Sequence, residues 1–351
     1  MHKAHMKQKV LIVGGGIVGC MTAMQLVKYG YEVTIVERNQ IASQTSGESS
    51  WAGAGILFPL LPWMYLNEVN QLTMRGAKLY EETCATLLNE TGLDAELIQS
   101  GMLLLPPFDE IAAQNWCEQN QLPFQHVKSG FEPKLATHEG NALWLPTVSQ
   151  VRPPKLMQAL RAWLEKNNVI LLERTELKPL KETKNLESWQ TLNGENLQAD
   201  IFIVTSGAWS FELLKETASQ LNIKPMRGQI LLYKPEKNLD HMVYKDGFYM
   251  VPRKDGYLLA GSTLEDVGFD PKTTEAIRDE LAAKAEAIMP SLKGLPIIKH
   301  WSGLRPGTPD NLPTIGKHPH IKNLYLNTGH FRYGLTMAPA SAELLVKQIV
   351  S

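Results

Sequence analysis

The chain has 351 residues, of which 44% are hydrophobic and 20% are charged. This composition is typical of a globular protein with room for two domains, and it excludes a disordered or coiled-coil chain. The formal net charge of −1 gives no long-range attraction to polyanions, so we expect no nucleic-acid partner.

The three cysteines, Cys20, Cys84 and Cys117, are widely spaced and form neither a disulfide framework nor a zinc pattern. No pair of histidines has metal-ligand spacing, so we predict no metal site. Residues 1–9 are basic but lead directly into a strand without a small-residue cleavage site, so we expect no signal peptide. The longest largely apolar run, 52–66, is too short to span a bilayer and predicts no transmembrane segment. These features favour the cytoplasm.

The N-terminal segment carries the strongest motif. Val10 to Val13 predicts a short buried strand, a glycine-rich turn follows, and apolar residues then recur at helical spacing. A second strand is expected from Glu32 to Val36, with Glu37 at its end. A strand, a G-x-G-x-x-G turn, a helix, a strand and a terminal acidic residue together form the βαβ unit that binds a dinucleotide.

Each glycine of this turn has a physical task. Gly14 permits the tight turn, Gly16 lets the backbone approach a pyrophosphate, and Gly19 lets the helix pack against the strand. The helix N-terminus then offers free N–H groups to phosphate. A carboxylate at Glu37 can accept hydrogen bonds from both ribose hydroxyls and would repel a 2′-phosphate, so FAD or NAD is favoured over NADP.

A loop rich in serine and glycine, Ser43 to Gly55, follows where a typical NAD domain would continue into a helix. Small residues let the backbone approach a flat ring or a phosphate, and the hydroxyls of Thr45, Ser46 and Ser50 can form hydrogen bonds with it. We therefore expect this loop to contact a ligand or a tight packing partner.

The middle of the chain alternates between two patterns. A helix is expected from Leu72 to Glu90, a strand-like stretch from Glu96 to Leu105, and a short helix near Ile111 to Gln119. From Pro153 a helix and two apolar strands, 169–172 and 200–205, return to the parallel α/β pattern.

Gly207 follows the last of these strands. Ligands bind at the carboxyl ends of strands in open α/β sheets, so we expect Gly207 near the cofactor.

From Gln229 the pattern becomes antiparallel. The stretch 248–263 predicts a hairpin turning at Asp255-Gly256, and 297–301 predicts one more strand that ends the second domain. The C-terminal part then gives an apolar strand, a glycine-bounded turn from Gly329 to Gly334, and a closing helix with Pro339 in its first turn. Both ends of the chain therefore build the dinucleotide domain.

At this point the chain resembles the FAD-dependent amino-acid oxidases of the D-amino acid oxidase superfamily, in particular the bacterial glycine oxidases of thiamine biosynthesis. The matching segments span nearly the whole chain in order. They read VLIVGGGIVG, SSWAGAGIL, QSGML, VTSGAWS, YMVPRKDGYLLAGST, WSGLRPGTPDNLPTIGKHP, TGHFRYG and APA.

The expected fold is α/β plus α+β, with a Rossmann-like FAD-binding domain assembled from discontinuous segments and a second, substrate-binding domain built on an antiparallel sheet. The first domain is predicted to comprise 1–92, 147–225 and 302–351, and the second 93–146 and 226–301.

The resemblance also implies which residues hold FAD. Sarcosine oxidases of the superfamily attach flavin through a cysteine in the C-terminal third, and no cysteine follows Cys117, so the FAD is expected to be noncovalent. The implied cofactor residues are Gly14, Gly16, Ile17, Val18, Gly19, Glu37, Arg38, Thr45, Ser46, Ser50, Ala54, Gly55, Ile56, Leu177, Gly207, His330, Phe331, Arg332, Tyr333, Gly334, Leu335 and Thr336.

For the substrate, the resemblance implies that Arg305 anchors a carboxylate, with Tyr249 beside it and Arg332 as a second basic residue. These three are the expected catalytic residues, and Leu264 is expected to line the same pocket. Arg305 is expected in a turn rich in glycine and proline, where it can form a bidentate fork to a carboxylate, which fixes the substrate more rigidly than a lysine would. The alternatives are a surface ion pair for Arg305 and simple cross-strand packing for Tyr249.

The activity implied is oxidative deamination of glycine, sarcosine or small D-amino acids. Hydride would pass from the substrate Cα to flavin N5 and leave an imino acid, and O₂ would reoxidise the flavin and give H₂O₂. The implied use of the product is thiamine thiazole synthesis. No obvious side-chain acid or base stands out, which agrees with chemistry done by the cofactor. The alternatives are a D-amino acid dehydrogenase or larger-amine oxidase using another electron acceptor, and a flavoprotein without turnover. A homo-oligomer stays open.

Overall fold

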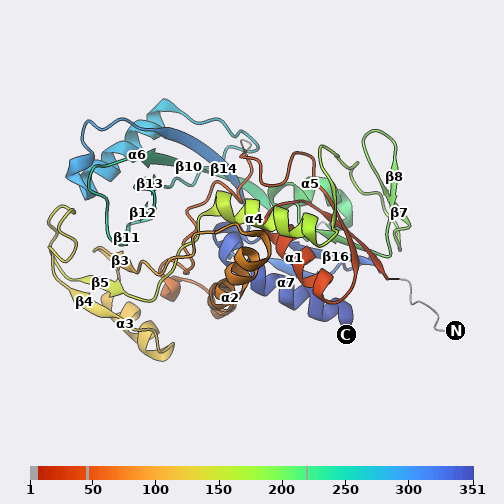
Figure 1. Ribbon diagram of the computed structural model, residues 1–351, viewed down its shortest axis with the longest axis horizontal. Coiled ribbons are helices and arrows are strands. Elements are labelled where there is room, and N and C mark those ends of the chain that lie inside the picture. Colours follow the sequence, from red (N-terminus) through yellow and green to blue (C-terminus); the bar gives the residue numbers. More distant parts are fainter. Residues whose placement is uncertain (1–6, 45–46, 219) are drawn as a thin grey trace.

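The computed structural model describes residues 7–44, 47–218 and 220–351. Two large sheets, one of six strands and one of eight, lie toward opposite ends of the molecule, with most of the helices packed around the first (Figure 1). This arrangement of a parallel α/β part and an antiparallel α+β part confirms the predicted fold class.

The six-stranded sheet is assembled from distant parts of the chain. Its strands, in spatial order, are β15 (Thr314–Lys317), β16 (Leu324–Thr328), β9 (Ile201–Val204), β1 (Lys9–Val13), β2 (Glu32–Val36) and β6 (Ile170–Leu172). All neighbours are parallel except β15 and β16. The carboxyl ends of β1, β2 and β9 therefore meet at one edge, where open α/β sheets bind ligands.

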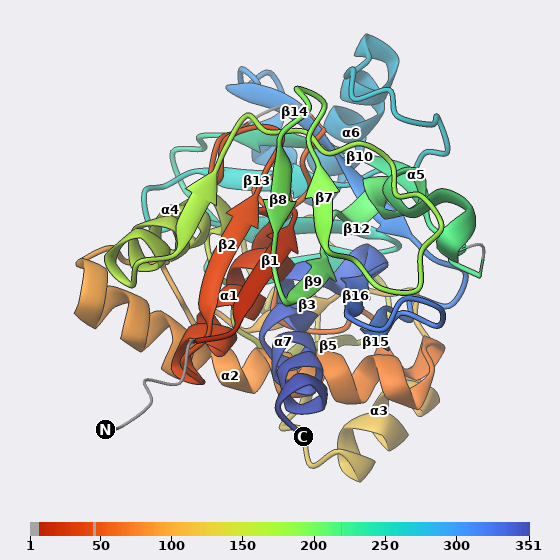
Figure 2. The same cartoon turned by 90° about the vertical axis from the view of Figure 1, so that its right-hand side faces the viewer.

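Both faces of this sheet are covered, as expected of a parallel sheet. Val10 and Ile12 pack with the helices on one face, whereas Leu11 and Val13 pack toward a hairpin on the other, because successive side chains of a strand alternate (Figure 2). The helices are α1 (Ile17–Lys28), α4 (Pro153–Lys166) and α7 (Gly334–Val350), with α2 (Asn67–Thr91) against α4 and α7; the hairpin is β7 (Ser188–Gln190) and β8 (Asn196–Gln198).

The eight-stranded sheet is antiparallel except for one parallel pair, β11 with β3. Its strands, in spatial order, are β14 (Lys299–Gly307), β10 (Lys224–Tyr233), β13 (Leu258–Gly261), β12 (Phe248–Pro252), β11 (Met242–Lys245), β3 (Met102–Leu104), β5 (Ala142–Leu145) and β4 (Gln125–Val127). Helix α6 (Glu275–Ile288) packs on one face, and the other face packs against the loop that carries Ala54, Ile56 and Phe58.

The remaining elements are short. They are α3 (Glu110–Gln119), α5 (Ser210–Leu214) and the 3₁₀ turns η1 (Pro62–Met64), η2 (Gly207–Trp209), η3 (Lys215–Ala218), η4 (Pro290–Leu292) and η5 (Phe331–Tyr333). Among the residues that the structure describes, no helix combines the length and apolar character needed to cross a membrane.

Three predicted elements differ from the structure. The strand-like stretch from Glu96 to Leu105 forms a strand only at β3, and the strand expected at 297–301 is β14, which continues to Gly307. Arg305 therefore lies in a strand and not in a turn. The prolines and glycines after Trp301 suggested a turn, but β14 is an edge strand, where a missing backbone donor is tolerated.

Pro339 was expected in the first turn of the closing helix, but it lies inside α7, which begins at Gly334. A proline there cannot donate a backbone hydrogen bond to the carbonyl of Leu335. The hydroxyl of Tyr80 on α2 donates to that carbonyl at 2.6 Å instead. A tertiary contact thus satisfies the group that the proline leaves without its usual helical partner.

The domain boundaries stay a prediction. Both β10, which begins at Lys224, and β14, which ends at Gly307, run past the predicted limits of the second domain while remaining in the eight-stranded sheet.

Candidate active site

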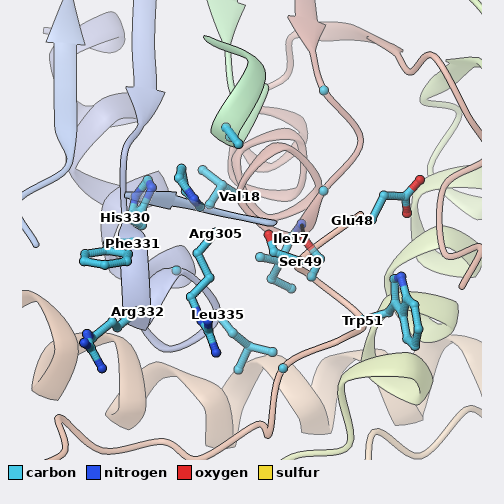
Figure 3. A pocket seen from close by; sticks show the side chains of 18 of the residues that line it. Ile17, Val18, Glu48, Ser49, Trp51, Arg305, His330, Phe331, Arg332 and Leu335 are labelled. Carbon is cyan, nitrogen blue, oxygen red and sulfur yellow. Dashed lines mark hydrogen bonds between the residues drawn. The ribbon is translucent and has the colours of Figure 1, made fainter. Parts of the chain in front are cut away.

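A cavity of about 840 Å³ is lined by the carboxyl ends of β1, β2 and β9, by strands of the eight-stranded sheet and by the start of α7. This volume is typical of a cofactor or small-molecule site. Every predicted site residue that the structure describes lines the cavity except Gly19. Thr45 and Ser46 lie outside the described residues. Figure 3 shows side chains from both parts of the molecule around this space.

The glycines of the β1–α1 turn differ in what surrounds them. Gly14 has a φ of 112°, and a Cβ there would lie 2.8 Å from the carbonyl oxygen of Thr205. A Cβ on Gly19 would lie 2.0 Å from the carbonyl oxygen of Gly14, so this glycine packs the helix under the turn, as predicted. A Cβ on Gly16 would meet only the hydroxyl oxygen of Ser50, at 3.0 Å. The space above Gly16 thus fits a ligand that approaches the backbone closely.

The helix N-terminus beside this space suits an anion. The first turn of α1 contains no acidic residue, and the hydroxyl of Ser50 accepts the N–H of Ile17 at 2.9 Å. Free N–H groups and the helix dipole favour negative charge there. The arrangement fits the pyrophosphate of a dinucleotide.

Glu37 is held at the end of β2 by two backbone donors. Its Oε2 accepts the N–H of Gly15 at 2.8 Å, and its Oε1 accepts the N–H of Asn39 at 2.9 Å. A carboxylate accepts about four hydrogen bonds, so acceptor positions remain for the hydroxyls of a ribose. Next to it, the guanidinium carbon of Arg38 lies 3.8 Å from the centre of the Trp209 ring. These groups fit the adenosine half of the cofactor.

Glu48 is a cavity residue that the sequence analysis missed. Burial, with a smaller contribution from the nearby Glu37 carboxylate, raises the pKa of Glu48 to about 7, although the hydrogen bond from Asn39 opposes this shift. That bond runs from Asn39 Nδ2 to Glu48 Oε1 over 2.8 Å. Glu48 and Ser49 lie on the same side of the cavity as Ile17 (Figure 3). No local motif marks Glu48, because its surroundings arise from tertiary contacts with Glu37 and Asn39.

The opposite wall is formed by η5 and the start of α7. His330 is buried, and burial lowers its pKa to about 3, so its ring is neutral. Its Nε2 has no hydrogen-bond partner within the described part of the chain. Arg332 is exposed at the cavity, whereas the hydroxyl of Tyr333 donates to the carbonyl of Leu60 at 3.1 Å.

The backbone stretch 54–56 is fastened from two sides. The hydroxyl of Thr336 donates to the carbonyl of Ile56 at 2.9 Å, and Nη2 of the buried Arg253 donates to the carbonyl of Ala54 at 2.7 Å. A fixed backbone at this wall suits a rigid planar ring. Arg253 follows β12, and nothing in its local sequence indicated this contact.

Arg305 points into the cavity from β14 (Figure 3). Its Nη1 donates to the carbonyl of Thr263 at 3.1 Å, and its Nη2 donates to the hydroxyl of Ser262 at 2.8 Å. Burial lowers the pKa of Arg305, and the neighbouring Tyr249 opposes this shift. An arginine remains charged at neutral pH even when its pKa falls. The cavity wall therefore carries a fixed, partly desolvated positive charge.

Several tyrosines line the same cavity. Tyr249 on β12 is buried and is the cross-strand partner of Tyr244 on β11, and both line the cavity. Tyr65 packs edge-to-face on Tyr333 with the ring centres 5.3 Å apart. Tyr65 and Tyr244 were missed from the sequence. A second turn signal, Asp246-Gly247, could have placed Tyr244 opposite Tyr249. Tyr65 reaches the cavity only through tertiary packing.

Leu264 lines the cavity with 41% of its surface exposed, so it lies at a rim and not in the interior. Leu177, after β6, is buried and lines the cavity. Gly207 follows β9 at the carboxyl edge of the sheet, as expected.

Comparison with known proteins agrees with this geometry. Residues 9–348 match the DAO family, described as FAD dependent oxidoreductase. The chain belongs to this family. Its cofactor is therefore FAD. No group of histidine, cysteine or acidic residues in the described ranges is arranged to hold a metal ion.

Individual relatives are similar over the whole chain. The chain is 38% identical to glycine oxidase from Pseudomonas aeruginosa over 97% of its own length and 94% of the relative's. It is 30% identical to the bifunctional protein ThiO/ThiG of Trichormus variabilis over 98% of its length, and it spans 53% of that longer protein. The crystal structure of glycine oxidase from Bacillus cereus superposes with a TM-score of 0.89 at 25% identity, covering 98% of this chain and 95% of that one.

Proposed function

We propose that this flavoenzyme catalyses the oxidative deamination of glycine or another small amino acid. The observation that carries the proposal is the guanidinium of Arg305, fixed at the cavity wall by Ser262 and Thr263 beside the buried Tyr249. The glycine oxidases among its relatives support a small amino acid as the substrate.

The proposed role of Arg305 depends on the N–H donors of its guanidinium that the protein itself does not use. Two N–H groups of Arg305 are used by the protein, and a guanidinium has five, so others are available to a substrate carboxylate. Bidentate pairing would orient the substrate Cα. We propose that Tyr249 and Arg332 assist at the same end of the cavity, that Leu264 limits substrate size at the rim, and that the predicted cofactor residues lining the cavity hold FAD.

FAD, when bound, supplies the two-electron acceptor for the hydride that leaves the substrate Cα. The chain's part is to bind the carboxylate, orient the substrate and exclude water. His330 is neutral and buried, so it adds no charge beside the site. We propose O₂ as the final acceptor, with H₂O₂ and an imino acid as products, and noncovalent attachment of FAD.

The biological setting is also a proposal. We infer a role in thiamine synthesis, supported by the ThiO/ThiG relative. We infer the cytoplasm as the compartment, because Cys20, Cys84 and Cys117 are free thiols. Association into a homo-oligomer stays a prediction.

Arg305→Ala tests the proposal. Removing a charge-assisted bidentate pair should lower kcat/KM for glycine and D-alanine by a factor of about 100 or more, corresponding to roughly 3 kcal/mol. FAD content should stay normal. Ethylamine, which has no carboxylate, should be affected far less. Oxygen uptake and H₂O₂ formation in the same assays test the electron acceptor.

The matched control is Arg278→Ala on α6, where an exposed arginine pairs with Glu275 and Asp279. This substitution removes a guanidinium from a surface ion pair. It should leave kcat/KM for glycine, D-alanine and ethylamine unchanged. An equal loss on glycine, D-alanine and ethylamine in Arg305→Ala would disprove the carboxylate anchor.

A further inference from the structure

Gly228 on β10 lies directly beneath the guanidinium of Arg305. A Cβ at Gly228 would lie 2.0 Å from Nη1 and 2.4 Å from both Cζ and Nη2 of Arg305. Real Cβ atoms do not approach other heavy atoms so closely, so any side chain at this position would occupy the place of the guanidinium. The φ of Gly228 is not in the left-handed region, so the backbone conformation does not itself require glycine here.

The strand register explains this contact. Gly228 faces Gly303 across the β10–β14 pair, and Arg305 faces Met226. Arg305 therefore reaches Gly228 along the diagonal of the pair, a distance within reach of a long side chain. Glycines at both 228 and 303 leave this patch of the two strands without side chains of their own.

Residues on both sides of Gly228 fasten the segment that binds Arg305. The N–H of Gln229 donates to the hydroxyl of Thr263 at 2.9 Å. The buried Arg227 donates through Nη2 to Glu265 at 2.6 Å, and the backbones of these two residues exchange hydrogen bonds at 2.9 Å. Thr263 in turn accepts from Arg305. Residues 227–229 of β10 thus have two effects. Gly228 leaves space for the guanidinium, and its two neighbours hold the segment 262–265, which carries both acceptors for Arg305.

We propose that Gly228 is a positioning residue that makes the site selective for carboxylates, by leaving room for Arg305 to lie flat against β10 in reach of Ser262 and Thr263. A methyl group there moves the guanidinium outward into the cavity. The shift breaks its two hydrogen bonds and places the charge where the substrate should bind. This inference rests on the carboxylate-anchor function proposed for Arg305.

Gly228→Ala in the FAD-bound enzyme is the direct test. The clash is with the flexible end of a side chain, so the protein should fold and retain FAD. Acetate, which carries only the carboxylate, should bind at least tenfold more weakly, measured by the change it causes in the flavin spectrum. KM for glycine should rise by a similar factor with a smaller change in kcat, and kcat/KM for ethylamine should fall by a smaller factor than kcat/KM for glycine, because only glycine loses a carboxylate pairing.

Gly307→Ala is the matched control, since it adds the same methyl group to the same strand pair. A Cβ at Gly307 would meet the side chain of Met226 at 2.5 Å and not Arg305. This variant should bind acetate like the parent enzyme. Weakening of equal size in both variants would overturn the proposal, because it would show a general effect on the sheet.

A double-mutant cycle provides a readout that does not depend on activity. Gly228→Ala should lower the Tm of the parent protein but cause little further loss in an Arg305→Ala background, where the guanidinium is absent. An equal loss of Tm in both backgrounds would refute the positioning role. If Arg305→Ala itself leaves acetate binding unchanged, the proposed function fails; if it weakens acetate binding and Gly228→Ala does not, only the present inference fails.

Discussion

Glu48 shows how a single carboxyl group is changed by its place in the cavity. It is partly buried, lies near the Glu37 carboxylate and accepts one hydrogen bond from Asn39. Burial disfavours the ionised form, which is the main reason for its pKa of about 7. The group therefore titrates near neutral pH instead of near the ordinary carboxylate range.

This shift predicts a pH dependence of stability. The pKa of Glu48 is higher in the folded protein than in the unfolded chain, so the folded state binds more protons between these two values. Its contribution to stability is thus complete below about pH 4.5 and is lost as pH rises through about 7. Glu48→Gln keeps the oxygen that accepts from Asn39 but cannot ionise. The apoprotein variant should match the parent Tm at pH 4.5 and exceed it at pH 8.

Glu176→Gln serves as a control, because it removes the same charge from an exposed position lining the cavity. Its Tm difference from the parent should be alike at the two pH values. If the Tm difference between Glu48→Gln and the parent is the same at pH 4.5 and pH 8, burial does not raise the pKa of Glu48 and the prediction is wrong.

At the scale of elements, the β1–α1 turn needs glycines for two different reasons. Some positions have no room for a side chain because the backbone packs closely, and another leaves space open for a ligand. Gly14 and Gly19 are needed by the protein, because a Cβ on either would collide with the backbone of Thr205 or Gly14. Gly16 has no such conflict and meets only Ser50. We therefore propose that its lack of a side chain serves the ligand and not the fold.

Gly16→Val should consequently separate cofactor binding from folding. The added side chain would fill the space above the helix N-terminus and disturb the bond between Ser50 and Ile17. We expect the affinity of the apoprotein for FAD to fall by a factor of at least about 100, or roughly 2.8 kcal/mol. Titration with FAD measures the loss, and circular dichroism checks that the fold is kept. Stoichiometric FAD in the purified variant would refute this role of Gly16.

At the scale of the molecule, the proposed FAD site and the proposed carboxylate anchor share one cavity, which residues of both large sheets line. Cys20, Cys84 and Cys117 are buried and none is among the residues that line it, although the thiol of Cys20 donates to the carbonyl of the lining residue Gly15 at 3.3 Å. Burial raises the pKa of Cys20 to about 12 and that of Cys117 to about 11, so neither thiol is a nucleophile at neutral pH.

FAD should therefore be released when the protein is denatured. Acid precipitation of the purified yellow protein should leave essentially all of the flavin in the supernatant, measured by its absorbance. Flavin that stays with the washed pellet would show a covalent link and would contradict the noncovalent attachment inferred from the cysteines.

Much of the molecule follows from local sequence patterns. The βαβ unit at 10–36, the hairpin turning at Asp255-Gly256 and the helix from Pro153 were all predicted and are present in the structure. Strand and helix periods, glycine turns and proline positions depend on neighbouring residues, so they are readable without the fold. The predicted family and the FAD cofactor were confirmed as well, because the motifs recur in order along the whole chain.

Other features depend on contacts between distant segments. The sequence did not predict that Arg305 lies in a strand or that Glu48 lines the cavity. It also did not predict the hydrogen bond from Tyr80 to the carbonyl of Leu335, which Pro339 leaves without a helical donor. The guanidinium of Arg305 lies over Gly228 because of the register between β10 and β14, although the two residues are 77 positions apart in sequence (305 − 228). Strand register and the closure of long loops are set by the packing of whole sheets, so only the tertiary structure decides which side chains meet at the site.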